Sequence, residues 1–344
     1  MRRVLRIPLH ITNQFIHIEI QKRILENEMS KININLTSGN NLLRETIVID
    51  NASLEDHSSF VNLFNKQYNR KTKSSYFFWQ FFESILPTRL LVARRNNAVV
   101  GFIGIQIKAL NNNEKCGVIV DMLIDEPYRG IGIFDKLAKE IEKYAMSHNV
   151  VALVSFTNSI GMKALTRLPN WKNIGKVFTL QSVTGLSIDD NVESDKYTNK
   201  IQSNNLISFF KNEEYRQWRY DRNPNYSYTK ISLKQDYFAI IKIFSDPITG
   251  QCFGDIVDFE GDMTDSKILK KLFTKASSQL KEQGIENITT WALPHTPLIT
   301  IIRELGFKQT QQERYFCLKV LNKKYEYLSD FFRWHLVQAD AEIF

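Results

Sequence analysis

The chain has 344 residues, which exceeds the usual size of a single hydrophobic core and predicts two domains. Its hydrophobic content of 43% with 12% aromatic residues is typical of packed globular domains and excludes a mainly disordered chain. The net charge of +8 is moderate, and the three widely spaced cysteines form neither a metal motif nor a disulfide framework, so we expect a cytoplasmic protein without a metal.

The N-terminal segment fits neither of the two domains. Residues 1–45 are predicted to be a leader outside both, and Met29-Ser-Lys-Ile-Asn reads like a natural start. Residues 1–28 are therefore either a mobile leader or an over-extended reading frame. Polar residues interrupt any signal-peptide core, and no apolar run approaches the roughly 20 residues of a membrane helix. We expect no association with a membrane.

Two helices, about 53–67 and 72–84, are expected next, followed by strands at about 90–95, 98–109 and 115–124. Seven basic residues and a single acid lie between Lys66 and Arg95. This basic cluster either attracts a phosphorylated ligand or is a solvated face without a partner. Nucleic-acid binding is not expected, because the aromatic residues between Tyr76 and Phe82 form one apolar block and do not alternate with the charges.

The third of these strands leads directly into a glycine loop and a helix. The loop reads Arg129-Gly130-Ile131-Gly132, and apolar residues recur with helical spacing over about 133–147. Glycine lets the backbone approach a ligand closely, and the first turn of a helix leaves N–H groups without acceptors. Together with the helix dipole, these groups favour a phosphate or pyrophosphate. The spacing fits neither the P-loop motif nor the GxGxxG motif.

The loop resembles the acetyl-CoA loop of the GNAT N-acetyltransferase superfamily, Gln/Arg-x-x-Gly-x-Gly/Ala. Arg129 and Gly132 occupy the two most diagnostic places, and Phe134 replaces the final Gly/Ala. The resemblance implies acetyl-CoA as co-substrate, with pantetheine paired along the end of the strand and the pyrophosphate on the loop amides. The cofactor-binding residues that it implies are Met122, Leu123, Ile124, Arg129, Gly130, Ile131, Gly132, Ile133, Phe134 and Asn158.

Transfer of an acyl group from a thioester to an amine requires a neutral amine and a donor for the oxyanion. The resemblance places Asp121 where many family members carry a glutamate, so we predict Asp121 as the catalytic base. A structural role is the alternative, because Asp258 occupies the matching place in the second half. The short helix after the next strand (150–156) lacks the tyrosine that the family uses as an acid, and Thr166 lies near its place. The thiolate then leaves unassisted or with the help of water or another group.

The second half repeats the first by its spacing. Trp79 precedes Asp121 by 42 residues, and Trp218 precedes Asp258 by 40 residues. A helix at about 203–220, three strands between 227 and 259, a helix at 265–282 and a strand at 286–292 follow the same order. Acidic residues replace the glycine loop after Asp258, so we expect one acetyl-CoA site per chain, in the first half.

The predicted fold is α/β (an α+β mixed sheet) with two tandem GNAT-like domains. The predicted organisation is a leader at 1–45, a GNAT domain with the acetyl-CoA site at 46–186, a polar linker at 187–200, a degenerate GNAT-like domain at 201–322 and an extension at 323–344. The resemblance covers residues 46–184 well and 201–320 loosely.

We predict an acetyl-CoA-dependent or acyl-CoA-dependent N-acyltransferase that acts on a primary amine of a small or medium metabolite. The tandem arrangement resembles that of bacterial acetyltransferases associated with cell-surface sugars, which makes a nucleotide-linked amino sugar a candidate acceptor. Two alternatives stay open. One is a tandem GNAT-like aminoacyl transferase, which needs no CoA loop. The other is a non-catalytic CoA-binding module, which the missing tyrosine favours.

Overall fold

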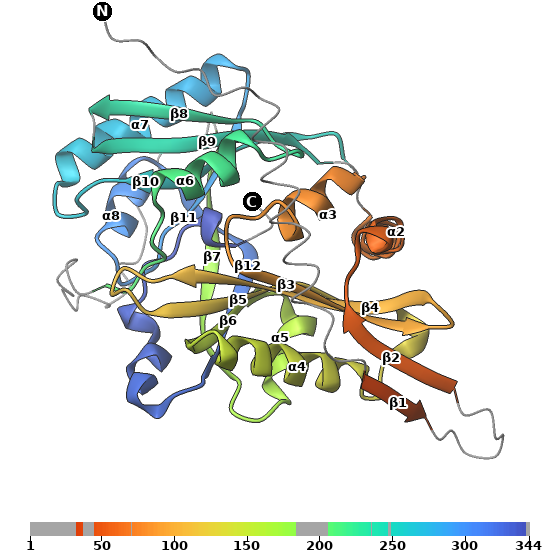
Figure 1. The fold of residues 1–344 in the computed structure, drawn as a ribbon. Helices are drawn as coiled ribbons and strands as arrows, with labels where there is room; N and C mark the ends of the chain where they lie inside the picture. The colour runs from red at the N-terminus through yellow and green to blue at the C-terminus, as the bar shows by residue number, and fades with distance from the viewer. Residues whose placement is uncertain are drawn as a thin grey trace, which may run out of the picture.

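The computed structural model describes residues 32–36, 45–69, 71–183, 206–234, 236–246 and 249–341. The strands among them form one 12-stranded mixed sheet in the order β1-β2-β3-β4-β5-β6-β12-β7-β11-β10-β9-β8, with helices packed on it (Figure 1). The predicted mixed α/β fold is confirmed. Most of the predicted leader (1–45) and the whole predicted linker (187–200) lie outside the described residues. In the part of the chain that the structure covers, no helix combines the length and hydropathy needed to cross a membrane.

The first half of the sheet is built around one strand–helix–strand unit. Its strands are β1 (Ile32–Leu36), β2 (Glu45–Asn51), β3 (Thr88–Arg95), β4 (Ala98–Ala109), β5 (Lys115–Ile124) and β6 (Val150–Thr157). On one face lie η1 (Leu54–Asp56), α2 (His57–Tyr68) and α3 (Ser74–Phe81); on the other lie α4 (Ile133–Ser147) and α5 (Ser159–Thr166). β5 and β6 are parallel, as expected for two strands joined by a crossover helix.

The second half repeats this plan. By sequence, β7 (Lys172–Val183) ends the first half. The elements of the second half are α6 (Glu213–Arg216), η4 (Gln217–Asp221), β8 (Tyr228–Lys234), β9 (Tyr237–Ser245), β10 (Cys252–Glu260), α7 (Ser266–Glu282), β11 (Asn287–Trp291), α8 (Leu298–Glu304) and β12 (Lys308–Val320). Three short helices follow, η5 (Lys323–Ser329), η6 (Phe331–Arg333) and η7 (Gln338–Asp340). β10 and β11 are parallel on either side of α7, as β5 and β6 are on either side of α4.

The helix predicted at about 203–220 is shorter than expected. It begins only at Glu213, because the side chain of Asn212 caps it by accepting a hydrogen bond from Tyr215 N at 2.8 Å. Upstream of this cap, Ile207 and Phe209 instead form isolated bridges to Trp334 and Leu110. The apolar residues of this segment therefore lie in an extended stretch of chain that contacts both halves.

The two halves exchange their last strands. β12 belongs to the second half by sequence but pairs with β6 of the first half, from Tyr315 opposite Thr157 onward. β7 ends the first half by sequence but pairs with β11, and β7 and β12 pair with each other along the seam. Each half of the sheet is therefore completed by a strand from the other half. The residue boundaries predicted for the two domains stay a prediction.

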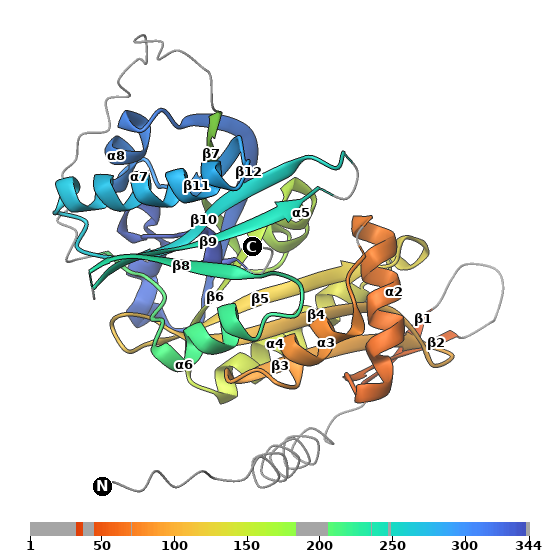
Figure 2. The same ribbon diagram turned by 90° about the horizontal axis from the view of Figure 1, so that it is seen from above.

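A reciprocal contact marks the junction of the halves. The rings of Trp79 and Trp218 stack with centroids 4.7 Å apart and an angle of 13° between their planes. Each indole N–H donates to the backbone carbonyl of the other tryptophan, at 3.0 and 3.4 Å. Two residues that make the same contact with each other in both directions are expected where two similar units are related by a two-fold axis. The helices that carry these residues, α3 and the α6–η4 segment, lie next to each other in Figure 2.

Candidate functional site

A cleft of about 1120 Å³ opens where β5 and β6 diverge. The parallel ladder between these strands ends at Val118 and Val154. Beyond that point both strands line the cleft, β5 with residues 119–124 and β6 with residues 155–157. The edge of β5 that faces β6 is open here, so an extended ligand with amide groups can pair with it as an added strand.

A β-bulge lies at Asp121, where β5 enters the cleft. The register between β4 and β5 shifts between Val120 and Leu123, and the φ angle of Asp121 is 48°. This left-handed conformation is uncommon for a residue other than glycine. The half-buried carboxylate lines the cleft, and the hydroxyl of Tyr76 on α3 donates to Asp121 Oδ2 at 3.5 Å. The bulge thus places a carboxylate at the point where the two strands separate.

The glycine loop presents the N-terminus of α4 to the cleft. Gly130 and Gly132 have φ angles of 81° and 83°, and no heavy atom lies within 4 Å of the place that a Cβ would take at either residue. Gly132 is the N-cap of α4 and offers no side chain to cap the first turn. The first N–H groups of the helix also have no acceptor within the helix. This is the geometry of an anion site, although Asp135 in the same turn sets a negative charge at its edge.

Arg129 holds the loop in place. Its Nε donates to the carbonyl of Ile124 at 3.0 Å, and its Nη2 donates to Gln67 Oε1 at 2.8 Å. These contacts tie the loop to the end of β5 and to α2. Asn158 has a comparable local role, because its Oδ1 caps α5 by accepting from Gly161 N at 2.9 Å.

The cleft brings together Asp121 and nine of the ten predicted cofactor-binding residues. Ile131 is the exception, since its side chain is 39% exposed and does not line the cleft. The functional roles of these residues stay predictions.

Further residues line the cleft without having been predicted, among them three basic side chains. Lys163 and Arg167 lie on and just after α5, one helical turn apart, a spacing that was visible in the sequence. Arg314 on β12 and Ala341 at the end of the described chain come from the second half. They had no signal in the sequence, because only the strand exchange and the path of the tail bring them to the cleft.

Among the described residues of the basic cluster between Lys66 and Arg95, none lines the cleft. Arg94 forms an ion pair with Asp56, and Lys66 forms one with Asp125 at 3.0 Å. The other two arginines on β3 bind neutral groups, Arg89 with Asn51 Oδ1 at 2.6 Å and Arg95 with the hydroxyl of Tyr128 at 2.8 Å. These four side chains therefore make contacts within the first half, and their position gives no support to a role in holding a ligand within the cleft.

The cleft offers no thiol or imidazole for covalent chemistry. Among the described residues that line it, none is a cysteine or a histidine. Burial raises the pKa of the Cys317 thiol to about 12, so this residue carries no thiolate near neutral pH. No group of three or more potential metal ligands occurs within the ranges that the structure describes. Asp121 is the lining carboxylate placed where the strands separate, which suits proton transfer rather than nucleophilic attack.

The counterpart of the cleft in the second half is filled. β10 and β11 pair only as far as Asp255 and Thr289, and β10 has its own bulge between Ile256 and Asp258. Beyond these residues, hydrogen bonds within the protein connect the two strands and the C-terminal tail. Thr290 Oγ1 donates to Ile256 O at 2.9 Å, and Gln338 of the tail donates to Thr289 Oγ1 at 3.0 Å.

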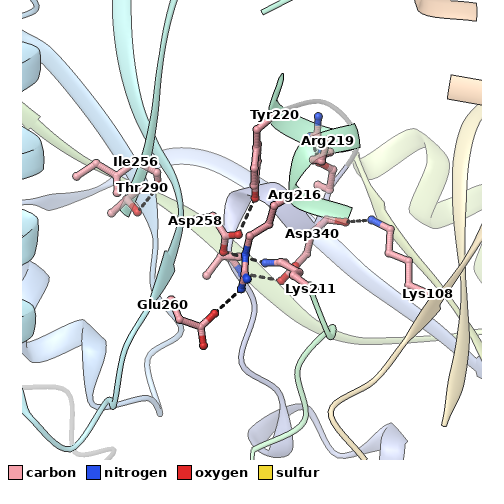
Figure 3. Close-up of polar contacts among 12 residues, drawn as sticks. Lys108, Lys211, Arg216, Arg219, Tyr220, Ile256, Asp258, Glu260, Thr290 and Asp340 are labelled. Atoms are coloured by element: carbon pink, nitrogen blue, oxygen red, sulfur yellow. Dashed lines mark hydrogen bonds and ion pairs between the residues drawn. The ribbon is translucent and has the colours of Figure 1, made fainter. Parts of the chain in front are cut away.

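Asp258, which matches Asp121 by sequence spacing, has structural partners instead of a cleft. It is buried and accepts from Lys211 Nζ at 2.8 Å and from the hydroxyl of Tyr220 at 2.6 Å (Figure 3). Burial raises the pKa of Tyr220 well above its ordinary value, and the charge on Asp258 adds to this effect. The duplicated aspartate is therefore a closed hydrogen-bonding centre in the second half.

Comparison with known proteins agrees with this geometry. Residues 57–166 match the family model described as Acetyltransferase (GNAT) family. A search among curated proteins gives no match. The fold is similar to that of N-myristoyltransferase of Saccharomyces cerevisiae with bound myristoyl-CoA, with a TM-score of 0.56, 11% identity, and coverage of 85% of this chain and 84% of that chain.

Two further solved structures are similar. A protein of Pyrococcus horikoshii described as an acetyltransferase has a TM-score of 0.53 at 13% identity, over 84% of this chain and 94% of that chain. A GCN5-related glucosamine N-acetyltransferase region in a fungal multi-domain GH3 β-N-acetylglucosaminidase has a TM-score of 0.53 at 11% identity. The match covers 82% of this chain but only 39% of that one. At these identities the likeness shows the fold alone.

Proposed function

We propose, from the GNAT domain at residues 57–166, that the chain is an N-acyltransferase that moves an acyl group from acetyl-CoA or another acyl-CoA to a primary amine. One observation carries the proposal. The open edge of β5, the uncapped N-terminus of α4 behind Gly132 and the carboxylate of Asp121 all face the same cleft. Together they supply a strand for pantetheine, an anion site for pyrophosphate and a base for the amine.

The reaction follows from these positions. Pantetheine amides pair with the edge of β5 at Met122–Ile124, which fixes the thioester beside the bulge. Asp121 accepts a proton from the incoming ammonium, directly or through a water, and the neutral nitrogen attacks the thioester carbonyl. The tetrahedral intermediate then collapses, the C–S bond breaks and CoA leaves as the thiolate, and the second proton of the amide nitrogen passes to this thiolate or to water. A thiol pKa near 8.5 allows this departure without an acid on the protein.

The acceptor contacts both halves in this proposal. Arg314 and Ala341 are the lining residues from the second half. Arg314 places a positive charge in the cleft, whereas the described residues of the basic cluster between Lys66 and Arg95 do not. An amine that also carries an anionic group, such as a nucleotide-linked amino sugar, has the charge to match Arg314. The intact glycine loop argues against an aminoacyl transferase, which needs no such loop.

We expect amine-dependent release of CoA thiol from acetyl-CoA when the purified chain is tested with a panel of amines. The panel includes simple amines, amino acids, free amino sugars and nucleotide-linked amino sugars, and mass spectrometry identifies the acylated product. Mixtures without amine serve as the control for hydrolysis. Fast turnover of simple uncharged amines would remove the nucleotide-sugar acceptor and keep the acyltransferase. Absence of amine-dependent thiol release with acyl-CoAs of every tested chain length, alongside measurable CoA binding, would favour a non-catalytic module.

A further inference from the structure

The C-terminal tail connects the closed centre of the second half with the cleft of the first. The helix η7 packs on β10, and Val337 and Ala339 are buried against Val257 and its neighbours on the same face. Two residues later, Ala341 is buried and lines the cleft. The tail therefore fills the counterpart site and then reaches the functional site.

One lysine holds the tail through a carboxylate. Lys211 Nζ lies 2.8 Å from Asp258 Oδ1 and 2.9 Å from Asp340 Oδ1, and all three side chains are at most 10% exposed (Figure 3). Burial alone would lower the pKa of Lys211, but the two carboxylates raise it above its ordinary value. Burial raises the pKa of Asp340, and the charge of Lys211 opposes this effect. The lysine is thus the counter-ion on which both buried carboxylates depend.

The tail backbone is held by two further cations. Lys108 Nζ on β4 donates to the carbonyl of Asp340 at 3.3 Å, and Arg219 Nη2 donates to the carbonyl of Ala341 at 3.4 Å. Asp340 Oδ2 also accepts from Val337 N at 2.9 Å, which fixes the turn of η7. Basic residues from both halves therefore converge on the last turn of the tail before it meets the cleft (Figure 3).

Ala341 lies on the same face of the sheet as the helix whose tyrosine contacts the proposed base. Ala341 shares a core cluster with Tyr76, whose hydroxyl contacts Asp121. The start of α4, which forms the anion site, belongs to the cluster on the opposite face of the sheet. A shift of the tail would thus change the cleft wall on this face and leave the loop at the start of α4 in place.

We propose that Lys211, Asp258 and Asp340 form a positioning network that holds the C-terminal tail as part of the acceptor wall of the cleft. The aspartate that matches the proposed base serves, in the second half, to fix a segment beside that base. The three residues do not touch the reacting atoms and act through the tail. This inference rests on the proposed function, because it assigns the acceptor side of the same cleft.

The test compares Lys211→Met with Lys270→Met in the full-length chain. Methionine keeps the length of the side chain and removes the charge, which leaves two buried carboxylates without a counter-ion and releases the tail. We expect the KM for the amine to rise by about tenfold or more, which corresponds to about 1.4 kcal/mol of lost binding, while the KM for acetyl-CoA stays within about twofold. Lys270 pairs with Glu304 at 2.9 Å on an exposed surface of the second half, so its substitution should change neither constant.

Two further measurements keep the inference separate from protein stability and from the proposed function. Hydrogen exchange of residues 336–341 should be faster in Lys211→Met than in Lys270→Met, and Lys211→Arg should restore both the exchange protection and the KM for the amine. If Lys211→Met does not fold, Asp340→Asn, which keeps the shape and removes one charge, replaces it.

Either of two results would overturn the positioning network: unchanged exchange of the tail in a folded variant, or an equal rise of both KM values. If the wild-type chain acylates no amine at all, the proposed function fails, and the exchange data alone decide whether Lys211 holds the tail.

Discussion

Replacement of Gly132 by aspartate is expected to abolish binding of acetyl-CoA, with a rise in Kd of about 10³-fold. Gly132 has a φ angle of 83° and no heavy atom within 4 Å of its missing Cβ, so the new side chain would project into the open space before the first turn of α4. Two like charges 4 Å apart repel by about 4 kcal/mol at an effective dielectric constant of 20. That energy corresponds to about three powers of ten in affinity, which calorimetry measures directly.

Gly306 provides a matched control for this substitution. It has the same φ angle of 83°, the same empty space around its missing Cβ, and a place after α8 in the second half. Gly306→Asp therefore carries the backbone cost of a left-handed aspartate, about 1–2 kcal/mol, without a charge at the cleft. Both variants should lose thermal stability, and only Gly132→Asp should lose acetyl-CoA. Near-normal affinity in a folded Gly132→Asp variant would place the pyrophosphate elsewhere.

Replacement of Asp121 by asparagine is expected to lower kcat by about 10²-fold to 10⁴-fold, the range typical for loss of a general base. Asparagine has nearly the same shape and tolerates the left-handed conformation of the bulge, so the strand should keep its form. The amide cannot accept the proton of the ammonium group. The KM for acetyl-CoA should stay nearly constant, because the edge of β5 and the loop are unchanged. Steady-state rates of thiol release, measured with an amine that the protein acylates, give both constants.

Asp262→Asn is the control for this experiment. Asp262 lies in the loop after β10 that takes the place of the glycine loop in the second half, and its carboxylate caps the N–H of Thr264 at 2.8 Å. The same change of charge at that place should leave kcat unaltered. A kcat in Asp121→Asn within a few-fold of the wild-type value would instead assign Asp121 the structural role that its duplication as Asp258 had left open.

The functional unit of the first half followed from local sequence patterns. The strand predicted at 115–124 and the helix predicted at 133–147 coincide with β5 and α4. The helix predicted at 265–282 coincides with α7 to within one residue. The spacing of the apolar residues in these elements specifies whether each is a helix or a strand. Glycines or turn residues at their boundaries specify where each begins and ends.

The pairing of the last strands did not follow from the sequence. The apolar pattern of β7 and β12 predicts that each is a strand, but it does not name a neighbour. β12 lies against β6 of the first half, a pairing between segments far apart in the chain. Arg314 and Ala341 reach the cleft through this long-range arrangement. The ion pair between Arg94 and Asp56 could not be predicted from the sequence either, because the two residues are far apart in the chain and meet only in the folded protein.

The stoichiometry of acetyl-CoA binding tests the central claim most directly. The first half has an open strand edge and an uncapped helix N-terminus, whereas the counterpart in the second half is filled by Gln338 and the rest of the tail. Calorimetric titration of the full chain should therefore give one acetyl-CoA per chain, with binding lost in Gly132→Asp. Two sites per chain, or no binding to the unsubstituted protein, would contradict the assignment of a single acyl-CoA site to the cleft between β5 and β6.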